Sequence, residues 1–257
     1  MTRGSFRWRL VLVMLPVFGL LGTGKFSSCF LATGQTTPSQ ANKNDGIGVP
    51  VDVPDDGTVQ AGSPLMYHDL RDGTILDLNT QLVWEKKDRA GGLHGQDDLF
   101  VWSGGGTQET IWDWLDDLNN GCANNEDMPC SADGDCGVGG KCGFAGHRDW
   151  RIPNVRELLS IVDYGAFIPT VDSAFNNNCA GTCTVLQCSC TAVNGFIPNV
   201  GAGVGPYWSS TSFARPAGTP EFIPPAAWSV DFSSGDSSID DQGLERHVRA
   251  VRGGRVH

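Results

Sequence analysis

The sequence predicts an α+β fold, in which two helices lie among antiparallel strands and disulfides hold long loops in place. Three observations support this prediction. The segments 111–118 and 155–162 share the apolar spacing of an amphipathic helix. Segments before and after them show the alternation and turn residues of paired strands. Eight cysteines fall in two groups of four, inside stretches rich in Gly and Asn.

The first 30 residues resemble a secretory signal peptide. Three arginines stand near the start, and Leu10 to Leu21 is an apolar run that is too short to span a bilayer comfortably. We therefore predict an exported protein, in the periplasm, on the outer surface or secreted. Two processing routes stay open: cleavage near the small residues 32–34, or lipid attachment at Cys29 behind a degenerate lipobox.

The predicted mature chain is strongly acidic. Four of the 18 Lys and Arg residues precede Gln35 and none of the acidic ones does, so 14 basic side chains face 29 acidic ones, a net charge of −15. Such a surface repels nucleic acid and anionic lipid, and it favours solubility and cation binding. We therefore expect that the mature chain does not bind nucleic acid and does not span a membrane.

Residues 31–64 are predicted to form an extended arm or linker, because they are rich in small and polar residues and lack a hydrophobic period. Residues 65–257 are predicted to form one domain, since their number is sufficient for a sizeable core. This domain opens with a hairpin signal. Strands are expected at 74–78 and 82–86, joined by a turn at Asn79-Thr80.

The first predicted helix follows in "ETIWDWLDDLNNG". Its apolar residues at 111, 114, 115 and 118 stand at the spacing of one helical face. Thr110 is a suitable N-cap and Gly121 a suitable stop.

The second predicted helix lies in "GHRDWRIPNVRELLSIVDYG", between Gly146 and Gly165. Asn154 is placed to cap this helix, with Glu157 reaching back as in a capping box, and Gly165 is expected to end it. Arg148, Asp149 and Arg151 flank Trp150 just before the helix. We expect them to hold the incoming loop by ion pairs, which makes this stretch a structural brace rather than a catalytic centre.

The last third of the chain has the pattern of strands. These are expected at 207–213, in "AAWSVDFSSGD" and at 247–253. In the second of them, Trp228, Val230 and Phe232 are expected to face the core, and Ser229 and Asp231 to face solvent.

The cysteines are predicted to form disulfides within each group, because an exported chain folds in an oxidising compartment. The first group is Cys122, Cys130, Cys136 and Cys142, and the second is Cys179, Cys183, Cys188 and Cys190. A Cys188–Cys190 bridge would be strained, so Cys179 is expected to pair with one of these two and Cys183 with the other. The spacings do not match a paired C-x2-C zinc site.

Seven segments, taken in order, resemble a known family. They are "ATGQT", "DGTILDLNTQLVWEKK", "GHRDWRIPNVRELLSIVDY", "FNNNCAGTCTVLQCSCT", "YWSST", "AWSVDF" and "VRAVRGG". Together they are similar to the domain at the C-terminus of the bacterial collagen-like adhesin Lcl, formerly a domain of unknown function. The combination covers nearly the whole mature chain.

The resemblance implies a C-type-lectin-like fold: two helices packed on twisted antiparallel sheets, with long loops on one side. It also implies an exported protein, since family members are mostly exported and a few are adhesins that bind sulfated polysaccharide. It supplies no catalytic residue. This chain departs from the family pattern at a Cys-rich insertion, 121–143, and in an arm without the expected cysteine pair.

No cofactor is expected, and no metal site is predicted outright. Binding of sulfated polysaccharide needs a basic patch, and strand alternation would split the arginines at 246, 249, 252 and 255 between two faces. Two acidic loops are candidates for a calcium site, although neither has EF-hand spacing. Their residues are Asp133, Asp135, Asp236, Asp240 and Asp241.

No catalytic residue is predicted, because the five histidines are scattered and G-x-S-x-G is absent. Most tryptophans have a place in a strand or on the apolar face of a helix. Trp102 and Trp112 do not, so they are the candidates for ligand contact.

We therefore expect an exported binding or adhesion domain, whose ligand is an extracellular or envelope glycan or a protein. A homo-oligomer is compatible with this prediction. One alternative is a structural component of the cell envelope without a small ligand. Another is a divergent oxidase or hydrolase on the related scaffold of the formylglycine-generating enzyme.

Overall fold

The computed structural model describes residues 30–37, 54–104, 107–123, 125–193, 205–218 and 224–254. The predicted α+β class is confirmed: few helices accompany antiparallel sheets, and four disulfides staple the loops. The C-type-lectin-like assignment stays a prediction. The predicted leader and Cys29 lie outside the described residues. Within these ranges, no helix has the length and apolarity needed to cross a bilayer.

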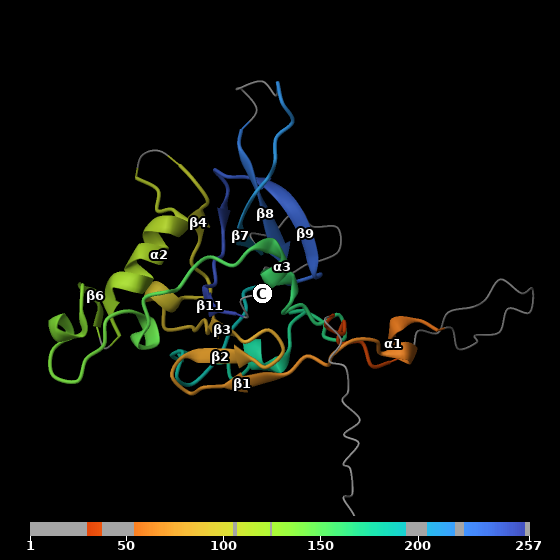
Figure 1. Ribbon diagram of the computed structural model, residues 1–257, viewed down its shortest axis with the longest axis horizontal. Helices are drawn as coiled ribbons and strands as arrows, with labels where there is room; N and C mark the ends of the chain where they lie inside the picture. Colours follow the sequence, from red (N-terminus) through yellow and green to blue (C-terminus); the bar gives the residue numbers. More distant parts are fainter. Residues whose placement is uncertain are drawn as a thin grey trace, which may run out of the picture.

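The first sheet has the strand order β1-β2-β3-β11 and lies at the bottom of Figure 1. It comprises β1 (Tyr67–Asp69), β2 (Thr74–Asp77), β3 (Leu82–Glu85) and β11 (Val251–Gly253). The predicted hairpin is confirmed, with Ile75 opposite Trp84 and both fully buried. The Asp77 carboxylate accepts hydrogen bonds from the backbone of Asn79 and Thr80 and so closes the turn.

The second sheet has the order β7-β8-β9 and stands at the top of the molecule (Figure 1). It comprises β7 (Pro206–Ser212), β8 (Ala226–Asp231) and β9 (Asp236–Asp241). The strict alternation predicted for β8 is wrong at two positions. Trp228 is only half-buried, whereas Ser229 is fully buried because its hydroxyl bonds to Ser238 and Asp240.

The predicted closing strand at 247–253 is shorter in the structure. Only Val251–Gly253 pair as β11, while Glu245–Arg246 form β10, which pairs with β4 (Phe100–Val101). The residues between them cross from one sheet to the other. Arg249 lies there, fully buried, and its guanidinium donates to the carbonyls of Glu85 and Cys190. It is therefore a core residue and takes no part in a surface patch.

Helix α2 (Ile111–Asn120) has the predicted caps. The Thr110 hydroxyl accepts from the backbone of Trp112 and Asp113, the Asp113 carboxylate accepts from Thr110, and Gly121 ends the helix.

Helix α3 (Val155–Leu159) has the predicted Asn154–Glu157 capping box. It ends at Leu159 rather than at Gly165, because residues 160–161 continue as a turn and Val162 then bridges to Val171.

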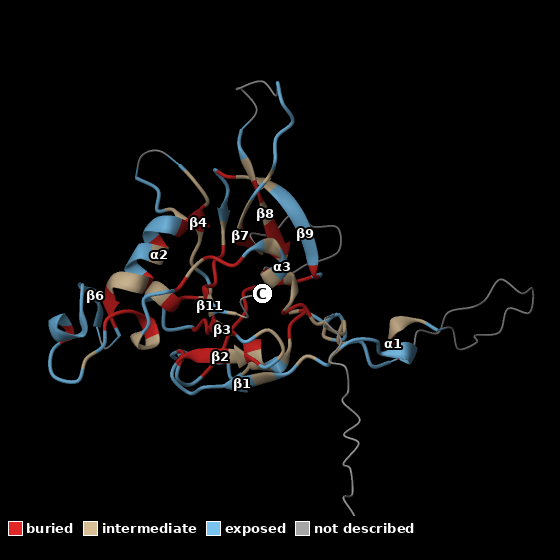
Figure 2. Ribbon diagram, viewed as in Figure 1, coloured by how far each residue is buried: buried red, intermediate tan, exposed pale blue. Residues whose placement is uncertain are grey.

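Two hydrophobic clusters form the core. One contains Trp84, Phe175 and Tyr207, and the other contains Trp114, Trp150 and Trp208. Figure 2 shows the buried segments at the centre and the exposed ones on α1, α2, β6 and β9. Short 3-10 turns at Gly92–His94, Asp133–Cys136, Phe144–Gly146 and Ser173–Phe175 connect the elements.

The described part of the arm is not simply extended. It carries a short helix, α1 (Asp56–Val59), and Leu31 bridges to Ser63. The backbone N–H of Tyr164 donates to the carbonyl of Thr33, so the "ATGQT" segment docks on the domain beyond α3.

The described residues of the predicted Cys-rich insertion, 121–143, fold as a small unit of their own. It contains β5 (Gly121–Cys122) and β6 (Asn125–Pro129), which pair antiparallel. The Cys122–Cys136 and Cys130–Cys142 bridges close it. Its two ends meet where the N–H of Gly143 donates to the carbonyl of Gly121 at 2.8 Å. We call residues 121–143 the Cys-rich hairpin.

Candidate functional site

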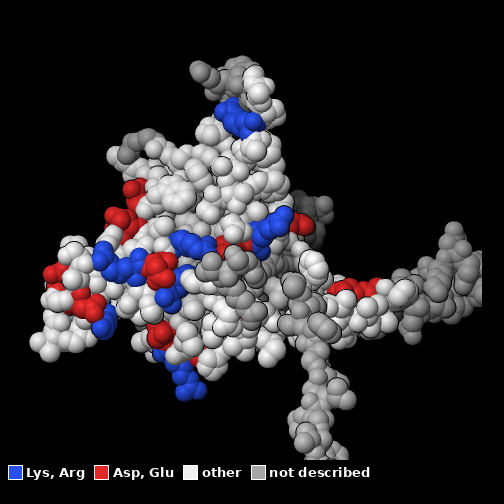
Figure 3. Space-filling model, viewed as in Figure 1, with Lys and Arg blue, Asp and Glu red and all other residues white. Residues whose placement is uncertain are grey.

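The segment that leads into α3 acts as a brace. The Arg151 guanidinium binds both carboxylate oxygens of Glu157 at 2.7 Å, and Asp149 accepts from Arg252 at 2.8 Å. Arg148 donates to the carbonyls of Asn119 and Ser131. Figure 3 shows basic and acidic side chains next to one another in a row across the middle of this face. The polar residues of this motif thus bind backbone and one another.

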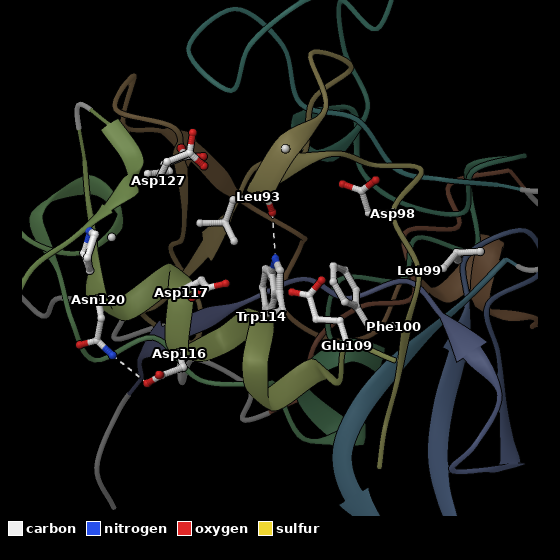
Figure 4. Close-up of a pocket in the computed structure, with 14 residues that line it drawn as sticks. Leu93, Asp98, Leu99, Phe100, Glu109, Trp114, Asp116, Asp117, Asn120 and Asp127 are labelled. Carbon is white, nitrogen blue, oxygen red and sulfur yellow. Dashed lines mark hydrogen bonds between the residues drawn. The ribbon is translucent and has the colours of Figure 1, made fainter. Parts of the chain in front are cut away.

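A concavity lies between α2, β4 and the Cys-rich hairpin. It is a groove of about 960 Å³, and Trp114, Leu93 and Phe100 form its apolar part. In Figure 4, the indole N–H of Trp114 donates to the carbonyl of Leu93, at 2.9 Å. We call this concavity the α2 groove. Its size is that of a typical ligand site.

Carboxylates dominate the rest of the α2 groove: Asp98, Glu109, Asp116, Asp117, Glu126 and Asp127 line it. Figure 4 shows Asp117 and Glu109 on either side of the Trp114 ring, with Asp98 and Asp127 further out. Burial and the neighbouring carboxylates raise the pKa of Glu109, and burial together with Asp116 and Asp113 raises that of Asp117. The groove therefore carries an excess of negative charge that a cationic group would relieve.

A buried charge cluster lies behind the α2 groove. Glu85 is fully buried, and its Oε1 lies 2.9 Å from Lys87 Nζ and 2.7 Å from His94 Nδ1. Its Oε2 accepts from the backbone N–H of Ala250 at 2.8 Å. On the far side of the imidazole, His94 Nε2 lies 3.0 Å from Glu126 Oε1, in the wall of the groove.

The protonation states in the buried charge cluster follow from these contacts. Burial disfavours the charge on His94, but the carboxylates of Glu126 and Glu85 outweigh it and raise the pKa of His94 to about 9. Burial lowers the pKa of Lys87, and Glu85 opposes that change. Burial would raise the pKa of Glu85, but Lys87 and His94 hold it below its usual value. At neutral pH, His94 is thus a buried cation between two carboxylates.

The sequence profile of the Lcl C-terminal domain matches residues 73–252, well over half of the 257 residues. The chain belongs to the Lcl C-terminal domain family. No curated protein and no solved structure matches the chain.

In this Lcl C-terminal domain, the two candidate tryptophans meet at the surface. Trp102 and Trp112 contact edge to face, with ring centroids 5.1 Å apart. The indole N–H of Trp102 donates to the carbonyl of Ser209, whereas Trp112 is 39% exposed. They are ten positions apart in sequence, and β4 and α2 bring them together. We call them the tryptophan pair.

The five candidate calcium ligands are not brought together in this family member. Asp135 accepts from the backbone of Ser131 and Ala132, and Asp133 pairs with Lys141. Asp240 pairs with Arg246 at 3.2 Å, and the Asp241 carboxylate accepts from the backbone of Gly243. Asp236 begins β9 on an exposed position.

The disulfides stay within the two groups, as expected. In the second group, Cys179 pairs with Cys190 and Cys183 with Cys188. Among the described residues, only these cysteine clusters bring three or more potential metal-ligating groups together, and their sulfurs are held in disulfides.

Sequence reasoning missed Glu85, His94 and Glu126. The run "EKKD" after Trp84 has the composition of an exposed strand end, but Glu85, Lys86 and Lys87 are all buried. The available signal was the density of acidic residues between Asp97 and Asp127, which points to one negative surface.

Proposed function

We propose that this Lcl C-terminal domain is an exported binding domain on a C-type-lectin-like scaffold, that its ligand is a glycan, and that it performs no catalysis. The observation that carries the proposal is the tryptophan pair. The four disulfides fit an exported protein. The charged residues of the most recognisable motif are occupied in bracing α3, which supports a scaffold role for that motif.

The tryptophan pair has the properties of a sugar-contacting surface. Trp102 is fixed by its hydrogen bond to Ser209, so one ring is pre-oriented at little entropic cost. Trp112 leaves part of its aromatic surface open to solvent. A pyranose ring can place its C–H groups on such a face while its hydroxyls stay hydrated. Next to the pair, the Ser103 hydroxyl donates to the Gln242 side chain at 2.7 Å, which adds a polar rim.

Trp112→Ala is expected to weaken glycan binding about tenfold or more, because it removes the exposed ring and the partner of Trp102. The measurement is a glycan array on the purified protein, followed by titration of the best hit, with and without calcium. Phe167→Ala is the matched control, since Phe167 is 86% exposed and distant in sequence from the pair. Equal binding by the wild type, Trp112→Ala and Phe167→Ala would contradict the role of the tryptophan pair. An array on which no glycan is bound would favour a structural component of the envelope.

A protein ligand is the second candidate, and the α2 groove favours it. The side chains of Asp98, Glu109, Asp117 and Asp127 make no hydrogen bond or ion pair with any described residue. A lysine- or arginine-bearing segment would complement them and could rest its aliphatic stems on Leu93 and Leu99, the half-buried apolar residues of the groove.

The test of this second candidate is titration with an oligolysine peptide at low and high salt. Binding is expected to weaken steeply with salt and to drop in the double variant Glu109→Gln/Asp117→Asn. Trp112→Ala should leave it unchanged. Salt-independent binding, or equal binding by the double variant, would count against the α2 groove.

A further inference from the structure

The Cys-rich hairpin is cross-linked within itself, and it leaves and re-enters the domain at adjacent points. Both of its disulfides connect cysteines of the hairpin itself. Its four cysteines form a small cluster separate from the two main hydrophobic clusters. At its base, the N–H of Cys130 donates to the carbonyl of Asn120, and Arg148 donates to the carbonyl of Ser131. These properties allow it to move as one body about its base.

The hairpin is also attached to the buried core through Glu126. This residue lies on β6, and its Oε1 is 3.0 Å from His94 Nε2. The two atoms are not aligned as a hydrogen bond, so the attraction is mainly between charges. His94 itself is fixed, because its Nδ1 lies 2.7 Å from the fully buried Glu85. Glu126 is 40% exposed and borders the α2 groove.

Charged groups surround His94 on each packed element. Glu85 and Lys87 face it from the end of β3, and the carboxylate of Asp88, the next residue of that segment, is attracted to its charge. From the hairpin, Glu126 faces it. The ring of Phe144 covers another side, with centroids 4.1 Å apart, and adds no charge. Of these charged groups, Glu126 alone belongs to the Cys-rich hairpin.

We propose that the Cys-rich hairpin is a movable wall of the α2 groove, which the His94–Glu126 ion pair holds closed and which is released when His94 loses its proton. Glu126, Asp127 and Pro129 all lie on this wall, so its movement changes the width of the groove. This movement belongs to the hairpin itself and is the same whether the ligand is a glycan or a protein.

The direction of the pH effect follows from the proton on His94. Its pKa in the folded chain is about 9, above the ordinary value of 6.5. The contribution of the ion pair is therefore complete below about pH 6.5 and is lost as the pH rises through about 9. The wall is closed at neutral pH and opens in alkaline solution.

The methionines provide a direct readout. Met128 lies on β6, and Met66 precedes β1, so a methyl-labelled chain reports on the hairpin and the domain separately. We expect the NMR order parameter of the Met128 methyl to fall between pH 7 and 10, with a midpoint near 9, while that of Met66 stays constant. Met128→Leu assigns the signal.

Two variants test the cause of the movement. In Glu126→Gln, the Met128 order parameter should already be low at pH 7 and should not change up to pH 10. Lys141→Gln is the matched control, because it breaks the exposed Lys141–Asp133 pair of the same hairpin and should behave as the wild type. A constant Met128 order parameter in the wild type would overturn the proposal. So would a fall shared by Met66, since that would report global loosening.

Discussion

Replacing Glu85 with Gln is expected to lower the free energy of unfolding by about 3–5 kcal/mol at pH 7. The substitution keeps the shape of the side chain but leaves Lys87 and His94 as buried cations without a counter-charge. Both are almost fully buried, so water cannot replace the carboxylate. Chemical denaturation with the disulfides intact measures the change.

Glu109→Gln is the matched control for Glu85→Gln, because it makes the same chemical change on the wall of the α2 groove. Glu109 is repelled by its acidic neighbours, so its neutralisation should leave stability unchanged or slightly increased. If the two variants unfolded at the same denaturant concentration, the buried charge cluster would contribute nothing specific to the fold.

Trp114→Ala is expected to cost about 3–5 kcal/mol, by the same measurement. The ring is 1% exposed, its N–H donates to the Leu93 carbonyl, and Lys87 Nζ lies 4.5 Å from its centroid. Removing it leaves a cavity between α2 and β4 and a cation without its aromatic partner, and it takes away the shorter of the two hydrogen bonds to the Leu93 carbonyl.

Trp112→Ala, two residues away on the same helix, provides the comparison. It removes an edge-to-face contact at the surface and should cost only about 1 kcal/mol. The two variants thus separate stability from binding: the first affects the fold, and the second affects the proposed glycan contact. Equal destabilisation by both would show that Trp112 is a structural residue.

The elements that were predictable from sequence are those set by local chemistry. The Thr110 and Asn154 caps, the hairpin turn at Asn79-Thr80 and the disulfide groups depend on residues close together in the chain. The pairing of Cys179 with Cys190 rather than with Cys188 was left open, because it depends on how the loop folds back.

The elements that were not predictable depend on tertiary contacts. Glu85 is buried only because Lys87, His94 and the backbone of Ala250 converge on it from three segments. Ser229 is buried for a similar reason, since β9 supplies partners for its hydroxyl. The α2 groove itself arises where the Cys-rich hairpin folds beside α2, and no local pattern specifies that placement.

The meeting of Gly121 and Gly143 has an evolutionary consequence. Because the hairpin leaves and re-enters the scaffold at nearly one point, a lineage can exchange it for a cassette of another length without disturbing how the remainder folds. Both of its disulfides lie inside the exchanged segment, so no cysteine of the remainder loses its partner. Recognition could thus diversify by swapping this single piece, while the framework around α3 stays the same.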